Sequence, residues 1–422
     1  MDIIKIAEKI EKNGGTLYLV GGAIRDKLLG KIVKDEDYVV TGIEKEKFLK
    51  LFPNCHKKGA FFEVFEIEKC EFALARCETK KGVGHKEFET KTGKEITIEE
   101  DLKRRDITIN AIAENVLTNE IIDPFNGRED IKNKIIRKVT ESFIEDPLRV
   151  YRVARFSATL EFQVEQNTIK LMNELKSELN TLSKERVFEE FKKALSSNKP
   201  SIFFEVLKKA NVLDVHFKEI YNLIGSLQLE KYHPEGDSYN HTMQVLDITA
   251  DYTKKLDIRF AGLVHDLGKG ITPSENYPHH YGHDTKGVEL VGAMGRKIGL
   301  PKSWIKSGKV AAKDHMIGGI FEKLTVQKKV QFIERVGRSN LGLEGMQIVV
   351  TADRKGRGNL ETEENIQFQE IGEKCLKEVT GRDIIQKYGE VENENFKKLL
   401  HQERVEWMKK NILISNAWHL GK

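Results

Sequence analysis

Cysteine is scarce in this sequence, and it has neither a long apolar run nor a large net charge. The four cysteines among 422 residues form no C-x-x-C pair, which argues against a disulfide framework and a cysteine-rich zinc site. No run approaches the ~18 apolar residues that cross a membrane, and residues 1–10 have the pattern of an amphipathic helix. We therefore expect a soluble, cytoplasmic protein with no membrane partner. Lys and Arg (70) nearly balance Asp and Glu (66), so any polyanion site must come from local clustering.

The character of the chain changes after its first third. Short β-rich runs alternate with turn residues up to residue 140, and the predicted strands are residues 16–20, 37–41, 61–67, 72–76 and 121–123. Helical spacing dominates beyond residue 142, with 348–350 as the one candidate strand. A chain of this length exceeds a single core. We predict an α+β fold, with a small mixed sheet in an N-terminal domain followed by helical domains.

Two details of the helical part can be predicted from local patterns. Ser142 and Glu145 have capping-box spacing, and Pro147 suits a first helical turn, so we expect a helix to start there. Near the C-terminus, apolar residues at helical spacing favour a packing face, which is formed by Phe396, Leu399, Leu400 and Trp407.

Two carboxylates lie two residues apart at the second predicted strand. Asp35 and Asp37 share a face there, because alternate side chains of a strand point the same way. Such carboxylates repel unless cations separate them, and Mg²⁺ prefers a few carboxylates together with phosphate oxygens. A solvated acidic turn explains this pair alone better. However, Gly21 and Gly22 permit close approach of a triphosphate and Arg25 can bind it, which together favour metal-dependent phosphate chemistry.

Residues 19–26, followed by residues 34–40, resemble the signature of the class II nucleotidyltransferases. This family contains the CCA-adding tRNA nucleotidyltransferases and their bacterial poly(A) polymerase relatives. Further blocks resemble the later motifs of the family in the same order, namely residues 72–78, 101–111, 122–127, 145–152 and 185–187. The resemblance covers essentially the whole chain and implies nucleotidyl transfer with release of pyrophosphate.

The resemblance also implies roles for single positions. Asp35 and Asp37 would hold Mg²⁺, and the nucleotide contacts would be Gly22, Arg25, Arg105, Asp146, Arg149 and Arg152. Asp146 and Arg149 would select the base, since a carboxylate and a guanidinium can match the amino group and ring nitrogen of cytosine and adenine. Spacing alone favours an ordinary surface ion pair for these two residues.

Three further expectations concern the surroundings of this site. Asp106 could orient Arg104 or Arg105 so that it clamps phosphates, although a charged helix start explains these residues equally well. A third metal-site carboxylate is expected at Glu71, with Glu78 as its rival, although either could equally be an exposed strand residue. Residues 79–94 resemble a mobile basic loop that helps the family switch from CTP to ATP, or they form an ordinary solvated hairpin.

A second constellation is rich in histidine. An adjacent His-Asp pair with a distant His and Asp has the ligand order of HD-domain phosphohydrolases. The sequence around these residues resembles the HD domain that is fused to some bacterial CCA-adding enzymes. Such ligands suit Ni²⁺, Mn²⁺ or Co²⁺ better than a thiolate-held zinc, and a bound metal activates water against a phosphoester. The resemblance implies 2′,3′-cyclic phosphodiesterase, 2′-nucleotidase and phosphatase activity. The expected ligands are His241, His265, Asp266 and Asp353, with His283 and His315 available to a second metal.

The predicted organisation is a nucleotidyltransferase head at 1–140, a helical neck and body at 141–220, an HD domain at 221–370 and a helical tail at 371–422. The head and neck would add C, C and A to the 3′ end of tRNA from CTP and ATP, with Mg²⁺ and without a nucleic-acid template. The chain would act as a monomer or homodimer. The alternatives are a poly(A) polymerase or partial CC- or A-adding enzyme, a metal phosphohydrolase whose head merely binds RNA, and a non-catalytic tRNA-binding protein.

Overall fold

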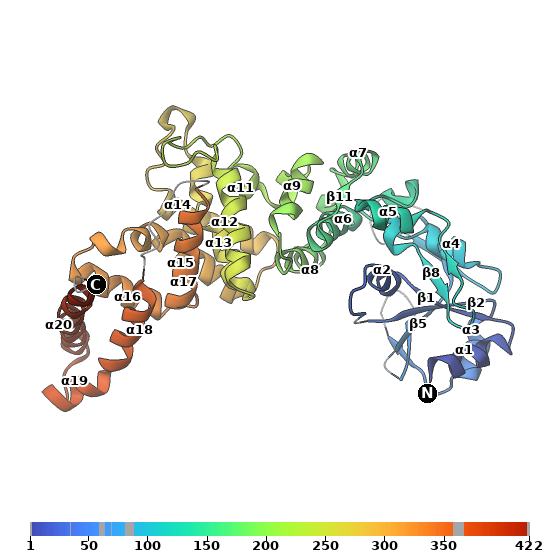
Figure 1. Cartoon of the computed structure of the whole chain (residues 1–422), viewed down its shortest axis with the longest axis horizontal. Coiled ribbons are helices and arrows are strands. Elements are labelled where there is room, and N and C mark those ends of the chain that lie inside the picture. The colour runs from blue at the N-terminus through green and yellow to red at the C-terminus, as the bar shows by residue number, and fades with distance from the viewer. Residues whose placement is uncertain are drawn as a thin grey trace. The chain divides into compact units, whose positions relative to one another are not determined.

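The computed structural model describes residues 2–33, 35–58, 64–68, 70–80, 88–357 and 367–419 (Figure 1). The chain divides into two compact units, Met1–Glu190 with Ile202–Val212 and Phe191–Ser201 with Leu213–Lys422. Among the described residues, no helix is both long enough and apolar enough to cross a membrane.

The first unit is built on a seven-stranded mixed sheet with the strand order β3-β4-β5-β2-β1-β8-β9. Strands β2 and β5 run parallel, and the other neighbours are antiparallel. The predicted strands at 16–20, 37–41 and 121–122 are confirmed, and those near 64–67 and 72–74 pair as expected, while residues 61–63 lie outside the described part. The bounds are β1 Thr16–Val20, β2 Asp37–Thr41, β3 His56–Lys58, β4 Val64–Ile67, β5 Cys70–Leu74, β8 Ala113–Asn115 and β9 Ile121–Ile122.

Helices cover both faces of this sheet because its strands carry apolar side chains on both faces. Leu17, Val40 and Phe72 point to the face that carries helices α1 (Ile3–Glu11) and α3 (Lys45–Leu51), which lie together in Figure 1. Val20 and Val39 point to the other face and pack with Ile98 and Leu102 of α4 (Ile98–Lys103). Burial on both faces holds the register of β1 and β2, since a one-residue slip would expose both sets.

The remaining elements of the first unit are mainly short helices. Strands β6 and β7 form a separate antiparallel hairpin, and β10 pairs with β11 in parallel. The bounds are β6 Arg76–Lys80, β7 Phe88–Thr92, β10 Ile135–Ile136, β11 Gln163–Val164, α2 Gly22–Leu28, α5 Gly127–Asn133, α6 Leu148–Leu160, α7 Gln166–Glu174, α8 Lys184–Leu195 and α9 Ser201–Lys209. Two strand residues therefore occur in a region that we expected to be strand-free.

The predicted helix start near residue 142 differs in detail. Thr140, not Ser142, supplies the cap, and it caps a short 3₁₀ turn at Glu141–Glu145. Helix α6 begins later, at Leu148, with Pro147 immediately before it. The capping-box spacing was misleading because the chain turns between residues 145 and 148, so two short elements replace one helix.

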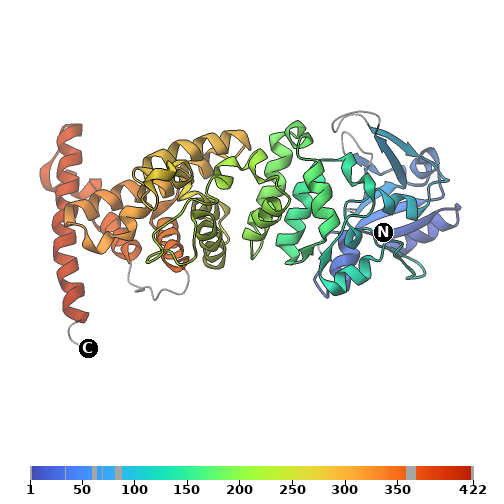
Figure 2. The ribbon, with the colours of Figure 1, turned by 90° about the horizontal axis from the view of Figure 1, so that it is seen from above.

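The second unit is helical, as predicted, and the α+β fold class is confirmed. Its helices are α10 Leu213–His216, α11 Lys218–Tyr221, α12 Ser238–Tyr252, α13 Leu256–Val264, α14 His283–Lys297, α15 Lys302–Gly319, α16 Val326–Gly337, α17 Gly342–Lys355, α18 Phe368–Glu378, α19 Gly381–Tyr388 and α20 Asn393–His419. Helices α12, α13, α15 and α17 pack against one another, and Figure 2 shows α20 as one long red helix.

One strand prediction in this unit is wrong and one packing prediction is confirmed. Residues 348–350 belong to α17, where Val349 and Val350 are buried in the main apolar cluster of the unit. Their β-branched side chains suit a strand, but packing against neighbouring helices decides the structure here. Leu400 is buried in the C-terminal cluster, and Phe396, Leu399 and Trp407 pack against it.

Candidate functional sites

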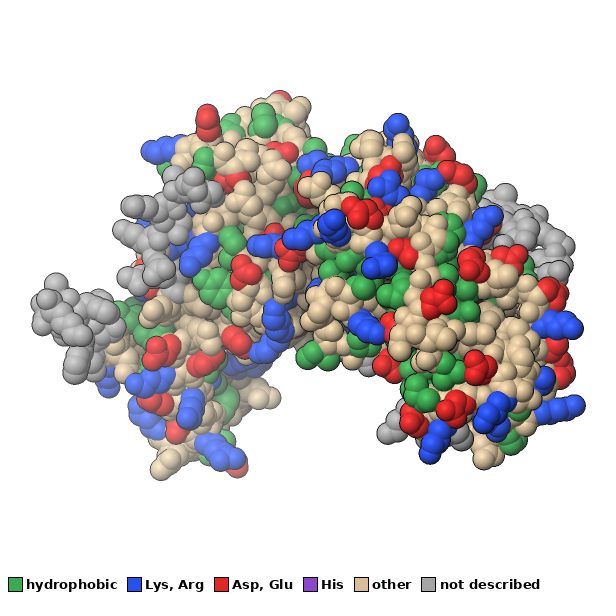
Figure 3. Space-filling model, turned by 45° about the vertical axis from the view of Figure 1, so that its right-hand side comes forward, with side chains coloured by type: hydrophobic (Ala, Val, Ile, Leu, Met, Phe, Trp, Pro, Cys, Tyr) green, Lys and Arg blue, Asp and Glu red, His purple; other side chains and the backbone are tan. Residues whose placement is uncertain are grey.

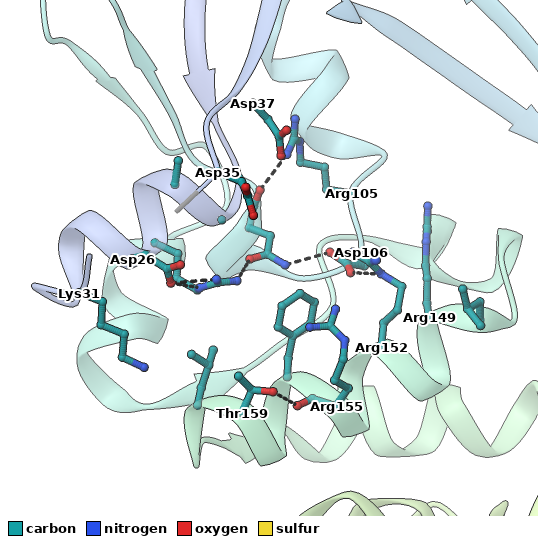
Figure 4. A pocket seen from close by; sticks show the side chains of 18 of the residues that line it. Asp26, Lys31, Asp35, Asp37, Arg105, Asp106, Arg149, Arg152, Arg155 and Thr159 are labelled. Carbon is teal, nitrogen blue, oxygen red and sulfur yellow. Dashed lines mark hydrogen bonds and ion pairs between the residues drawn. The ribbon is translucent and has the colours of Figure 1, made fainter. Parts of the chain in front are cut away.

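The largest described cavity of the first unit has a volume of about 1180 Å³ and is lined mostly by polar side chains (Figure 4). Eight arginines line it, against five aspartates. On the face drawn in Figure 3, basic and acidic side chains are interspersed, so the arginine excess is a local property of the cavity. The arginines are Arg25, Arg76, Arg104, Arg105, Arg149, Arg152, Arg155 and Arg186.

Asp35 and Asp37 both line this cavity, just before and at the start of β2. Partial burial raises the pKa of Asp37, and the carboxylates of Glu71 and Asp35 act in the same direction against the opposing charge of Arg105. Glu71 on β5 is the register partner of Asp37 on β2, although it does not line the cavity and lies 3.8 Å from Lys58. The side chains of residues 78–91, which include Glu78 and most of the basic segment 79–94, lie outside the described part. Asp35 and Asp37 are therefore the two carboxylates of this cavity that can hold a divalent cation at the start of β2.

A hydrogen-bond chain links the glycine motif to the third motif. Arg25 Nη1 donates to Asn110 Oδ1 at 2.7 Å, and Asn110 Nδ2 donates to Asp106 Oδ1 at 3.4 Å. Gly21 has a φ of +70°, and a Cβ atom there would lie 2.8 Å from Arg105 Nη1. Only glycine combines this backbone conformation with such a close approach. Gly21 therefore lets Arg105 lie against the turn that carries Gly22.

The arginines of the third motif are held by an acid that the sequence reasoning overlooked. Buried Asp101 pairs with Arg104 at 2.7 Å and with Arg105 at 3.2 Å. Asp106 pairs instead with Arg152 at 2.7 Å, so the expectation that it orients an arginine of its own motif is wrong. Burial alone would raise the pKa of Asp106, but Arg152 and Arg149 lower it to about 2. Asp106 therefore stays ionised and holds Arg152 at the cavity.

Asp146 and Arg149 lie at the start of α6 and both line the cavity. Asp146 Oδ1 accepts from the backbone N–H of Leu148 at 3.0 Å, and its Oδ2 accepts from Arg186 Nη2 at 2.9 Å. Arg149 donates to the backbone carbonyls of Ser142 and Arg104, both at 2.6 Å. These contacts fix both side chains before any nucleotide enters. Arg186 had not been predicted as a site residue, although the motif at 185–187 contained it.

The second unit has a cavity of about 510 Å³ where four helices bring the histidine constellation together. His241 comes from α12, His283 from α14, His315 from α15 and Asp353 from α17, and the His-Asp pair follows α13. The ligand atoms of these six residues form two groups, and within each group all ligand atoms lie within 4.8 Å of one another. One group is His241, His265 and Asp353, and the other is Asp266, His283 and His315. The structure thus gathers all six predicted residues.

Asp266 lies between the two groups. Its Oδ2 is 3.2 Å from His265 Nε2, while its Oδ1 is 3.4 Å from His283 Nε2 and 3.3 Å from His315 Nε2. One carboxylate can therefore serve ligands of both groups, which suits two neighbouring metal ions. His241 Nε2 lies 3.0 Å from Asp353 Oδ1 in the first group.

Several buried polar atoms of this cluster have no hydrogen-bond partner among the described residues: His265 Nε2, Asp266 Oδ1 and His283 Nε2. Unpaired buried polar atoms are costly, so their convergence fits a bound cation. Burial alone would raise the pKa of Asp266, but Lys269 and His265 hold that pKa well below its usual range. An ionised carboxylate and histidine nitrogens form a suitable donor set for a divalent transition metal.

Supporting residues around this cluster were missed by the sequence reasoning. Lys269 pairs with Asp266 at 2.6 Å and donates to Gln228 Oε1 at 2.6 Å. Glu235 Oε1 lies 2.8 Å from Nδ1 of both His233 and His241. Only the placement of His233 and Glu235 eight and six residues before His241 could have indicated these contacts.

Three family models match the chain and agree with these sites. They are the poly A polymerase head domain at residues 17–137, the probable RNA and SrmB-binding site of polymerase A at 161–223, and the HD domain at 238–333. The fold and the sites thus define a nucleotidyltransferase of the poly A polymerase class joined to an HD domain. The chain is 38% identical over 404 residues to a multifunctional CCA protein of Nitrosococcus oceani, with 94% of this chain and 98% of that protein covered. It therefore belongs to the multifunctional CCA protein family.

Solved structures of CCA-adding enzymes have a similar fold. A CCA-adding enzyme in complex with ATP matches with a TM-score of 0.64 at 18% identity, covering 100% of this chain and 94% of that one. The Thermotoga maritima CCA-adding enzyme complexed with tRNA matches with a TM-score of 0.64 at 17% identity, covering 98% and 95%. At these identities the likeness concerns the fold alone. The nucleotidyltransferase and HD domains imply dependence on divalent metals, and the ligand groups of the second unit fit such an ion.

Proposed function

We propose that the first unit adds C, C and A to the 3′ end of tRNA from CTP and ATP without a nucleic-acid template. The observation that carries this proposal is the first cavity, which combines Asp35 and Asp37 with eight arginines and with Asp146 and Arg149. The names of similar proteins support it, since they include a multifunctional CCA protein, a CCA-adding enzyme with ATP and a CCA-adding enzyme with tRNA.

The reaction joins the terminal ribose to the incoming nucleotide. The 3′-hydroxyl oxygen of the RNA forms a bond to the α-phosphorus, the bond to the pyrophosphate oxygen breaks, and the hydroxyl proton passes to water. Mg²⁺ held by Asp35 and Asp37 would stabilise the attacking and leaving oxygens. Arg25 and Arg105 bind the triphosphate, because guanidinium groups pair strongly with phosphate oxygens. Arg152, ionised and held by Asp106, adds a further contact.

Asp146 and Arg149 select the base in this proposal. Asp146 accepts from the exocyclic amino group that cytosine and adenine share, and the Arg149 guanidinium donates to a ring nitrogen. Uracil presents a carbonyl oxygen where Asp146 needs a donor, so UTP is rejected. Because the contact with Arg186 already orients Asp146, little side-chain freedom is lost when the base binds.

The decisive experiment supplies tRNA lacking its last three nucleotides with CTP, ATP and Mg²⁺, and sequences the products. We expect a single C-C-A addition that is abolished in Asp37→Ala. Tails of repeated A would favour a poly(A) polymerase, and addition of C alone or A alone would favour a partial enzyme. Absence of any incorporation would favour an RNA-binding protein and would overturn the proposal.

The second unit is proposed to hydrolyse phosphoesters, including nucleoside 2′,3′-cyclic phosphates, 2′-nucleotides and other phosphomonoesters. The observation that carries this function is the pair of ligand groups bridged by Asp266. Ni²⁺, Mn²⁺ or Co²⁺ would be held there and would lower the pKa of a bound water. In cyclic-phosphate hydrolysis the water oxygen bonds to phosphorus, one ester bond to the ribose breaks, and the freed ribose oxygen takes the proton.

Hydrolysis of 2′,3′-cyclic AMP with Ni²⁺ or Mn²⁺ tests this second function. His265→Ala should abolish hydrolysis and leave CCA addition intact, whereas Asp37→Ala should do the reverse. Hydrolysis that survives His265→Ala would remove the proposed site. The cytoplasmic location, the monomeric or dimeric state and the identity of each metal stay predictions.

A further inference from the structure

The mouth of the second cavity carries exposed aromatic and apolar side chains. Tyr281 is 78% exposed, Tyr232 is 51% exposed and Met316 is 47% exposed, and all three line the cavity together with His279. The rings of His279 and Tyr281 are stacked, with 5.6 Å between centroids and an angle of 21° between planes. We call these four residues the rim.

The rim is joined directly to the metal-binding groups. Tyr281 precedes His283 by two residues and Met316 follows His315 directly. Successive Cα atoms are about 3.8 Å apart, so the Cα of Tyr281 lies within roughly 7.6 Å of that of His283. An aromatic ring this close to the reacting phosphate would contact the remainder of a small substrate.

The loop that carries Tyr281 is held in place by its neighbours. His280 Nδ1 lies 2.9 Å from Thr272 Oγ1, and His280 Nε2 lies 3.0 Å from the carbonyl oxygen of Leu227. These contacts tie the loop to two other segments of the cavity wall and leave the rings of His279 and Tyr281 as its exposed part. The backbone of the loop that carries His279 and Tyr281 is thus anchored beside the His-Asp cluster.

We propose that the rim is a platform for the base of a nucleotide whose phosphate reacts at the His-Asp cluster. This inference rests on the proposed hydrolytic function and narrows its substrate to phosphoesters that carry a nucleobase. Exposed aromatic rings stack on any base, because every base has a π face, and one stack changes affinity about 5- to 150-fold. The cavity volume of about 510 Å³ falls within the range common for small-molecule sites.

Stacking makes two predictions that a merely structural tyrosine does not. Purine and pyrimidine substrates should depend on Tyr281 alike, because a platform reads no hydrogen-bonding edge. A substrate without a base should not depend on Tyr281 at all, because its phosphate still reaches the unchanged cluster.

The test compares Tyr281→Ala with the unaltered chain on three cyclic phosphates, those of adenosine, cytidine and ethylene glycol. We expect the KM for both nucleoside esters to rise about 5- to 150-fold with little change in kcat, and the KM for the glycol ester to stay the same. Tyr281→Phe, which keeps the ring, should restore the KM for both nucleosides. Tyr221→Ala is the matched control, since Tyr221 is an exposed tyrosine of the same unit outside the cavity lining.

A second measurement is independent of turnover. Calorimetric titration of the metal-free protein with adenosine 2′-monophosphate should give weaker binding in Tyr281→Ala by a similar factor. Equal effects of Tyr281→Ala on all three esters, or no effect on the nucleosides, would overturn the platform and leave the hydrolytic function standing. Failure of the unaltered chain to hydrolyse any of the esters would overturn both.

Discussion

Asp37 and Glu71 lie side by side on the parallel strands β2 and β5, as partners in the register of the sheet. They are 34 positions apart in the sequence, and the carboxylate of Glu71 helps to raise the pKa of Asp37. This relationship supports Glu71 as the third carboxylate of the proposed Mg²⁺ site, and it can be tested directly.

Replacing Glu71 by Gln should raise the Mg²⁺ concentration for half-maximal nucleotide addition by about tenfold, or ~1.4 kcal/mol, because one negative charge beside the cation is lost. Titration of nucleotide addition with Mg²⁺ measures this change. Glu66→Gln is the matched control. Glu66 is the register partner of Glu71 on β4, which lies on the side of β5 away from β2. An unchanged Mg²⁺ requirement in Glu71→Gln would remove Glu71 from the site.

Arg186 should control base selection through Asp146. Arg186→Ala removes the 2.9 Å contact that orients Asp146, and the loss of one charge-assisted hydrogen bond corresponds to roughly 1.5–3 kcal/mol. We expect the preference for CTP and ATP over UTP and GTP, measured as the ratio of kcat/KM values, to fall at least about tenfold. Lys184→Ala, an exposed substitution in the same helix, should preserve the preference. If Arg186→Ala slows all four nucleotides equally, its role is not in selection.

Glu235 should strengthen metal binding by orienting His241. Its Oε1 lies 2.8 Å from His241 Nδ1, so it can hold the ring with Nε2 directed at the cluster. A carboxylate that orients a metal-binding histidine contributes roughly 10- to 100-fold to metal affinity. We therefore expect Glu235→Gln to weaken Mn²⁺ binding by a similar factor. Calorimetric titration of the metal-free protein measures the change. The exposed Glu230→Gln is the control, and equal affinities for the two variants would contradict the assignment.

His216 should make the stability of the second unit depend on pH. Burial, together with the nearby charge of Lys297, lowers the pKa of His216 to about 4. Its contribution is therefore fully present above pH 6.5 and is lost as the pH falls toward 4, because only the unfolded chain takes up the proton in that window. The loss between pH 7 and pH 5 is about 2 kcal/mol.

Urea unfolding at pH 7 and pH 5 measures this effect. His216→Phe should show a smaller shift of the unfolding midpoint between the two pH values than the unaltered chain. His56→Phe, which changes an exposed histidine of β3, should keep the full shift. Identical shifts in all three proteins would show that His216 is not the titrating group.

Local patterns in the sequence were sufficient for much of the fold. β-rich runs bounded by turn residues identified β1 and β2, and helical spacing identified the packing face around Leu400. The failures occurred where local preference and packing disagree. Val349 and Val350 suit a strand by themselves, but the helices around them bury both side chains in α17.

The sequence by itself determined the α+β class, the family and the residue types of both sites, because these depend on short motifs and their spacing. Only the tertiary structure decided the pairings: Asp106 with Arg152, Asp146 with Arg186, and Asp37 beside Glu71. The partners are about 34 to 46 positions apart. Neither hydrophobic periodicity nor motif spacing specifies which distant charge will meet which, since strand register and helix packing set those distances.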